Sequence, residues 1–360
     1  MSLMLFVDVC ALYVPFLDHA YWNGLKLPDF VMPSFLFVTG VTVGISRSKP
    51  QRSFSRSIRL FLIGVLVQGR WIPQVGESVL GLDIKKFRVM GILQRIAVVY
   101  LILALTVTHL TPRTQFVVPA VCLLIHFLIL LLNPSSACTP NEWLSPGCDG
   151  LGRLDIALLG PSHILSPNIP NEPEGLGSSL ACVFTAFVGY LVGVTMRADR
   201  ASSGGYMLIQ EGSDLRPKRR VMLLGLLLAS LGLFVNIWIP FNKKLWTPSY
   251  NFFTAGVCCL ILVLCTRISK TTFMTPFTWL GANGLLFFIL SDCGGVVPAL
   301  MGSIWAGEPT NNMVTNSKVV CTWICQGDKA VGMLLYTLIE WLLLVWFCRF
   351  LFKNKLFFRV

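Results

Sequence analysis

The chain has 360 residues, of which 54% are hydrophobic and only 13% are charged, and its mean hydropathy is +0.70. This composition excludes a soluble globular protein and is typical of a protein that crosses a membrane several times. The formal net charge of +12 does not indicate nucleic-acid binding, because the basic residues lie in short segments between apolar stretches. We interpret them as orientation signals that face anionic membrane lipid.

The apolar stretches predict an all-α polytopic transmembrane bundle of about ten spans, formed by a single domain over residues 1–360. The first stretch, 3–17, is short for a span and has no basic flank, so we expect a chain that lacks its original beginning. The segment 296–305 is expected to be re-entrant or interfacial. Further spans are predicted at 30–45, 60–68 with its flanks, 89–110, 116–132, 176–196, 223–239, 252–265, 275–290 and 331–347.

Basic residues predict the orientation of these spans. The segments 47–59 and 197–220 are the richest in Arg and Lys, which places both in the cytosol, and counting the spans between them gives the same result. The polar loop 133–175 and the segment 18–24 then lie on the lumenal side. One loop departs from the rule that basic residues lie in the cytosol. Counting the spans makes this loop lumenal, yet it contains Arg70, Lys85, Lys86 and Arg88. These residues are either a site for an anionic ligand or a chance cluster.

Most of the 12 cysteines lie in apolar stretches, where Cys behaves as a small hydrophobic residue. Cys138 and Cys148 lie instead in the polar loop, and an oxidising lumen would allow them to form a disulfide. Cys321 and Cys325 are a weaker candidate pair. The sequence has no C-x-x-C pattern with matching histidines, so we predict no metal site.

The segment 18–29 gathers the strongest candidates for chemistry. His19 is the best group for proton transfer, because imidazole has a pKa of about 6.5, and it can also act as a nucleophile toward an activated acyl group. The alternative is a histidine that caps a helix or contacts lipid headgroups. Asp18, Trp22, Asn23 and Asp29 lie close to it in sequence.

Polar and charged residues within apolar stretches are further candidates, because a charge in the hydrocarbon is costly unless it faces a cavity or a partner. Asp8 and Arg95 have this position, as do Glu340 and Asn283. In the polar loop, Asp155, His163, Glu172 and Glu174 either face a substrate or are simply solvated. These residues alone do not distinguish an enzyme from a transporter.

The segment Asp18-His19-Ala20-Tyr21-Trp22-Asn23-Gly24 resembles the His-Ala-Ser-Trp-Asn-Gly segment of the heparan-α-glucosaminide N-acetyltransferase family. The likeness continues in order along nearly the whole chain. It includes Gly-Ile-Leu-Gln-Arg at 91–95 and Glu-Pro-Glu-Gly-Leu at 172–176. The other matching segments are 29–37, 148–163, Asn-Lys-Lys-Leu-Trp at 242–246, and 355–360.

This resemblance implies that the protein transfers an acetyl group from cytosolic acetyl-CoA to the amine of a terminal glucosamine of heparan sulfate, on the lumenal side of a lysosomal or other endomembrane. His19 would be the nucleophile or the general base, with Asn23 beside it and with Asp8 where the family has Asn. Five residues are expected to bind substrate: Asp18, Trp22, Asp29, Arg95 and Glu174. The expected partners are an amino sugar or the end of a glycosaminoglycan, and membrane lipid.

Three matters stay open at the level of sequence. The protein could instead be a transporter of a sugar or an acyl compound, since it has many spans with charges at membrane depth. It could also be an inactive relative, since its first segment is abrupt. Whether it forms a homodimer is likewise open.

Overall fold

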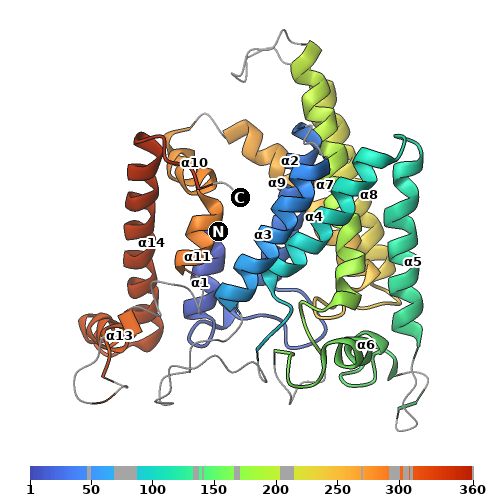
Figure 1. The fold of residues 1–360 in the computed structure, drawn as a ribbon. Helices are drawn as coiled ribbons and strands as arrows, with labels where there is room; N and C mark the ends of the chain where they lie inside the picture. Colours follow the sequence, from blue (N-terminus) through green and yellow to red (C-terminus); the bar gives the residue numbers. More distant parts are fainter. Residues whose placement is uncertain are drawn as a thin grey trace.

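The computed structural model describes residues 1–46, 50–68, 87–132, 138–139, 142–165, 171–202, 215–268, 271–291, 301–302, 308 and 311–358. These residues contain no β-strand, and long helices pack side by side as a bundle (Figure 1). The α-helices are α1 (Ser2–Cys10), α2 (Val31–Ile45), α3 (Pro50–Gln68), α4 (Ile92–His109), α5 (Val117–Leu131), α6 (Gly150–Leu159), α7 (Leu176–Ser202), α8 (Leu215–Val235), α9 (Pro248–Ile268), α10 (Thr275–Ala282), α11 (Gly284–Ser291), α13 (Met313–Ile324) and α14 (Lys329–Lys353).

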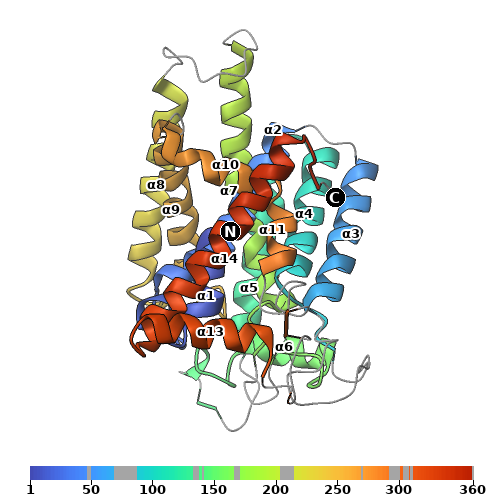
Figure 2. The ribbon, with the colours of Figure 1, turned by 90° about the vertical axis from the view of Figure 1, so that its left-hand side faces the viewer.

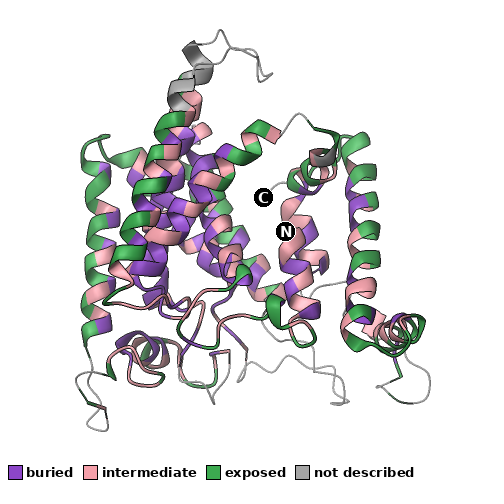
Figure 3. Ribbon diagram, turned by 180° about the vertical axis from the view of Figure 1, so that it is seen from behind, coloured by how far each residue is buried: buried purple, intermediate pink, exposed green. Residues whose placement is uncertain are grey.

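The all-α polytopic class is confirmed. Within the described residues, six helical segments are long and apolar enough to cross a membrane: Leu27–Ile45, Ile92–His109, Thr114–Leu131, Leu176–Ala198, Pro248–Ile268 and Lys329–Lys353. Large parts of α5 and α14 are exposed (Figure 3). Many of their exposed residues are Leu, Ile and Val, as expected for helices that contact lipid tails. The total of ten spans stays a prediction.

Two predicted segments differ from the structure. The stretch 275–290 is two short helices, because the backbone leaves the helical conformation at Asn283. The Asn283 side chain bonds the C-terminal segment instead, accepting from the Phe358 backbone N–H at 2.9 Å and donating to the Leu356 carbonyl at 3.3 Å. The first apolar stretch is helical only to Cys10 and ends in a 3₁₀ turn, Pro15–Leu17. The predicted re-entrant segment 296–305 lies outside the described residues apart from 301–302.

Helices α2 and α7 run parallel and touch backbone to backbone. Each has a Gly-x-x-x-Gly spacing, Gly40 with Gly44 and Gly189 with Gly193, which lets helices approach closely. A Cβ atom on Gly40 would lie 1.8 Å from the Ala186 carbonyl oxygen, and one on Gly189 would lie 2.1 Å from the Phe37 carbonyl oxygen. The starts of α2 and α7 are therefore held at the same end of the bundle.

The two ends of the bundle differ in character. The C-terminal ends of α2 and α7 lie at the same end of the bundle. The two segments predicted to be cytosolic, 47–59 and 197–220, adjoin this end. Residues 47–49 and 203–214 of these segments lie outside the described part. Helices α6 and α13 lie across the opposite end (Figures 1 and 2). Segment 18–30 precedes α2 and therefore belongs to that opposite end, in agreement with the predicted grouping of the loops.

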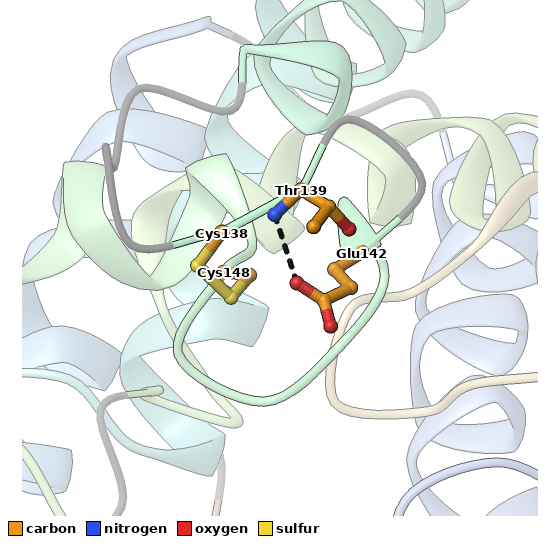
Figure 4. Close-up of a disulfide and its surroundings, with 4 residues drawn as sticks. All are labelled: Cys138, Thr139, Glu142 and Cys148. Atoms are coloured by element: carbon orange, nitrogen blue, oxygen red, sulfur yellow. Dashed lines mark hydrogen bonds between the residues drawn. A yellow bond between two sulfur atoms is a disulfide. The ribbon is translucent and has the colours of Figure 1, made fainter.

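The loop 133–175 contains helix α6 and a disulfide. Cys138 and Cys148 are bonded, with their Cα atoms 5.9 Å apart, and the Thr139 backbone N–H donates to the Glu142 carboxylate at 2.8 Å (Figure 4). Cys321 and Cys325 are both free, which corrects the weaker pairing. Asp149 caps α6 by accepting from the Gly152 backbone N–H at 2.6 Å. The described parts of this loop, 142–165 and 171–175 with 138–139, thus lie over this end of the bundle (Figure 1).

Replacing Gly189 with Val is expected to lower the free energy of unfolding by at least about 1–3 kcal/mol, because the added side chain separates α2 from α7. Thermal unfolding of the purified protein in detergent measures this change. Gly281→Val is the matched control, since nothing lies within 4 Å of a Cβ placed on Gly281. Equal unfolding temperatures for the two variants would contradict the role of this contact.

Candidate functional site

His19 and Asp29 form a hydrogen-bonded pair where segment 18–30 meets the start of α2. The His19 Nδ1 atom lies 2.8 Å from Asp29 Oδ1, and Asp29 is completely buried whereas 41% of the His19 side chain is exposed. An ionised carboxylate only accepts hydrogen bonds, so Nδ1 carries the proton that is shared with Asp29. The other ring nitrogen, Nε2, then carries the lone pair of the ring.

Asp29 is held by backbone and side-chain contacts from three parts of the chain. Its Oδ2 atom accepts from the Lys26 backbone N–H at 2.9 Å, which closes the short turn Leu27–Phe30. Its own carbonyl accepts from the Tyr250 hydroxyl of α9 at 2.6 Å. Asp29 therefore orients the imidazole ring. The sequence analysis expected Asp29 to bind substrate, but in the structure its buried carboxylate contacts His19.

Lys243, in the connection between α8 and α9, completes this cluster. Its Nζ atom lies 3.1 Å from His19 Nδ1, 3.4 Å from His19 Nε2 and 3.7 Å from Asp29 Oδ1. Burial lowers the pKa of the Lys243 ammonium group, while the carboxylates of Asp29, Glu174 and Asp8 act in the opposite direction. Sequence reasoning singled out Lys243 only as part of the segment 242–246, because nothing in the pattern distinguishes it from Lys244.

A second group of charges adjoins the first. Arg88 forms ion pairs with Glu172 and Glu174, and all three side chains are largely buried. Burial alone would raise the pKa of Glu174, but the positive charges of Arg88, Arg95 and Lys243 lower it overall. Arg88 is thus neutralised within the protein, which explains its place in a loop that breaks the charge rule. Arg70, Lys85 and Lys86 lie outside the described residues.

Arg95 fixes the start of α7 against α4. Its Nη2 atom donates to the Pro173 carbonyl at 2.6 Å and also bonds Ser178 Oγ, and its guanidinium lies 5.1 Å from the Trp246 ring centre. These contacts hold the segment with Glu174 beside the segment with Lys243. The Arg95 side chain is 1% exposed, so its contacts here are to the protein itself.

The other predicted residues fall into two groups. Asp8 of α1 is close enough to Lys243 to influence its charge, and Asn23 accepts from the Asn242 amide at 3.1 Å. Trp22, by contrast, is buried under the disulfide loop, where its Nε1 donates to the Leu144 carbonyl at 2.7 Å. Asp18 is 59% exposed and faces Lys26. The structure therefore brings Asp8, His19, Asn23, Asp29, Arg95 and Glu174 together and leaves Asp18 and Trp22 outside the cluster.

A cavity of about 240 Å³ lies at the opposite end of the bundle. It is lined by hydroxyl groups, one guanidinium and apolar side chains from α2, α3, α4 and α7: Val43, Ser46, Ser53, Ala104, Val107, Thr108, Tyr190 and Arg197. Among the residues that the structure describes, no group of three or more His, Cys, Asp or Glu side chains is arranged to hold a metal ion.

The fold and this site define a polytopic membrane protein with a histidine, a buried carboxylate and a lysine clustered at one end of its bundle. The chain is 24% identical over 347 residues to human heparan-α-glucosaminide N-acetyltransferase, covering 80% of this chain. It is also 24% identical over 349 residues to the mouse enzyme of the same name. It is thus a distant homologue of these acetyltransferases and spans about half of their length. No protein-family model matches the chain.

Asp155 of α6 makes the stability of this end depend on pH. Its carboxylate accepts from the Gly177 backbone N–H at 3.1 Å, and burial raises its pKa from 3.8 to about 6, against the effects of this bond and of Arg95. Between these pH values the folded state binds more protons than the unfolded state, so this contribution to stability falls as the pH rises. One pKa unit corresponds to about 1.4 kcal/mol, so the change is worth about 3 kcal/mol at most.

We expect Asp155→Asn to remove this contribution. Wild type should lose stability relative to the variant between about pH 4 and pH 7, because only wild type must ionise the buried carboxyl group at position 155. Thermal unfolding of both proteins across this range is the measurement. A difference between wild type and variant that does not change with pH would contradict the assignment.

Proposed function

We propose that the protein is a transmembrane acetyltransferase. In this proposal it moves an acetyl group from cytosolic acetyl-CoA to the amine of a terminal glucosamine, of the heparan sulfate type, on the lumenal side of a lysosomal or other endomembrane. The names of the two relatives support the reaction class. The observation that carries the proposal is the His19–Asp29 pair, with Nδ1 to Oδ1 at 2.8 Å.

The pair supports two chemical routes. In one, His19 Nε2 takes the proton from the acceptor amine as the amine attacks the acetyl carbonyl carbon. In the other, Nε2 itself attacks that carbon and carries the acetyl group until the amine displaces the imidazole. Both routes need a fixed ring and a partner for the positive charge that develops on it, and buried Asp29 provides both.

The positions of the site and the cavity support a donor and an acceptor that approach from opposite ends. Helix α2 begins beside Asp29 and contributes Val43 to the cavity, about 20 Å away at the rise of a helix. Arg197 and the hydroxyl groups of the cavity suit an anionic nucleotide such as CoA. CoA is too highly charged to cross a bilayer, so in this proposal its nucleotide stays at the cytosolic end and only its acetyl thioester end reaches His19.

The remaining predicted residues have supporting roles in this proposal. The carboxylates of Asp8 and Glu174 would attract the amino group of the acceptor sugar, since both lie close enough to influence Lys243. Asn23 would orient the acceptor, or the loop that meets it, through its bond to Asn242. Asp18 and Trp22 have a weaker claim to substrate contact, because the first lies outside the cluster and the second is buried.

Replacing His19 with Ala is expected to lower acetyl transfer by about 10²–10⁴-fold, because the group that moves the proton or carries the acetyl is removed. Asp29→Asn should also lower kcat, because an amide does not balance a positive charge on the ring. The assay uses purified protein in detergent with radiolabelled acetyl-CoA and glucosamine. His109→Ala is the matched control, since His109 lies exposed at the far end of α4.

Two results would contradict this proposal. Full transfer by His19→Ala would exclude the histidine, and absence of labelled glucosamine with wild type would exclude the acetyltransferase. Movement of an unmodified sugar or acyl compound across proteoliposomes would then favour a transporter. Omitting glucosamine separates the two routes, because only the covalent route leaves label on the protein before the acceptor is added.

A further inference from the structure

Lys243 is held against His19 by an unusually well-anchored loop. The Gly24 backbone N–H donates to the Phe241 carbonyl at 2.8 Å, and the Asn242 amide donates to Asn23 Oδ1 at 3.1 Å. Within the loop, Asn242 Oδ1 accepts from the Leu245 backbone N–H at 2.9 Å. The bonds on either side of Lys243 fix its backbone relative to the segment that carries His19, so the close approach of Nζ to the ring is built into the fold.

The neighbouring lysine faces a different environment. Lys244 Nζ lies 5.4 Å from the ring centres of both Tyr21 and Trp22. Lys243 instead faces the carboxylates of Asp29, Glu174 and Asp8, with Arg95 as the opposing charge, and only 20% of its side chain is exposed. Two adjacent lysines therefore form a natural pair of test and control.

We propose that Lys243 is a catalytic residue of the acetyl transfer, an inference that rests on the proposed function: its ammonium group donates a hydrogen bond to the acetyl oxygen when that oxygen becomes negatively charged. The Nζ atom is 3.4 Å from His19 Nε2. An acetyl carbon that reacts beside Nε2 therefore places its oxygen within reach of an N–H group of Lys243.

The electrons and protons of the step balance. The attacking nitrogen, either the acceptor amine or Nε2, forms a bond to the thioester carbon, and the C=O pair moves to the oxygen that Lys243 holds. The pair then returns, the C–S bond breaks, and the sulfur leaves with its electrons. On the direct route it takes up the proton that Nε2 received from the amine, which gives CoA-SH. On the covalent route the amine then attacks the acetyl carbon and the C–Nε2 bond breaks, and the proton that the amine loses balances the one that the thiolate takes up. Lys243 keeps all its protons throughout, so its contribution is to stabilise charge that exists mainly in the transition state.

A purely structural lysine would behave differently. If Lys243 only neutralised buried Asp29, its removal would lower stability while leaving the turnover of folded protein intact. The comparison therefore uses Lys243→Met, Lys243→Arg and Lys244→Met, each measured for kcat, for KM toward acetyl-CoA and for thermal unfolding. Arg keeps a positive donor, whereas Met keeps only the approximate length of the side chain.

The expected result is a 10²–10³-fold loss of kcat in Lys243→Met with KM for acetyl-CoA little changed. The kcat of Lys243→Arg should be at least tenfold higher than that of Lys243→Met. Lys244→Met should retain the kcat of wild type. If Lys243→Met does not accumulate in the membrane, Lys243→Gln takes its place under the same criteria.

The outcomes separate this inference from the proposed function. Transfer by wild type together with an unchanged kcat in Lys243→Met would overturn the role of Lys243 and leave the acetyltransferase standing. An equal loss in Lys243→Met and Lys244→Met would overturn it too. Absence of transfer by wild type would overturn the proposed function and the inference together.

Discussion

The buried carboxylate of Asp29 is the group on which the organisation of this protein depends. Removing an ionised carboxylate from water is costly unless it is paired and hydrogen-bonded. Asp29 meets this requirement with His19 Nδ1, the Lys26 backbone N–H and the Lys243 ammonium group, and its backbone carbonyl receives the Tyr250 hydroxyl. Satisfying one charge thus draws together segment 18–26, the start of α2, the α8–α9 connection and α9.

The close contact of α2 with α7 extends this arrangement to a second group of charges. Because the two helices are parallel and in backbone contact, the start of α7 lies at the same end as Asp29. Arg95 then fastens that start to α4 through Pro173 and Ser178. The carboxylate of Glu174 consequently lies within electrostatic reach of Lys243. The glycine contact between α2 and α7 involves no charged side chain, yet it helps to place Glu174 near Lys243.

Sequence reasoning predicted the fold class, and it selected several residues that the structure brings together in one cluster, because both depend on local pattern. Apolar length predicts spans, and a histidine among carboxylates where a span meets water predicts chemistry. The helix break at Asn283 was not predicted, although the pair Asn283-Gly284 is a local turn signal. The contacts of the Asn283 side chain with Leu356 and Phe358, about 75 positions later, depend on the fold and have no local signal. Lys243 was missed as an individual residue for the same reason, since only the fold separates its environment from that of Lys244.

The same distinction explains why Trp22 and Asp18 differ from their sequence neighbour His19. The segment between the two 3₁₀ turns Pro15–Leu17 and Leu27–Phe30 forms no regular helix, so adjacent side chains in it can point in different directions. Trp22 is directed under the disulfide loop and Asp18 is largely exposed, whereas His19 faces Asp29 and Lys243. The imidazole of His19, which is 41% exposed, thus lies between the buried carboxylate of Asp29 and the ammonium group of Lys243. In the proposed function, this position holds one edge of the ring in place and leaves the ring accessible to a substrate at the edge of the membrane.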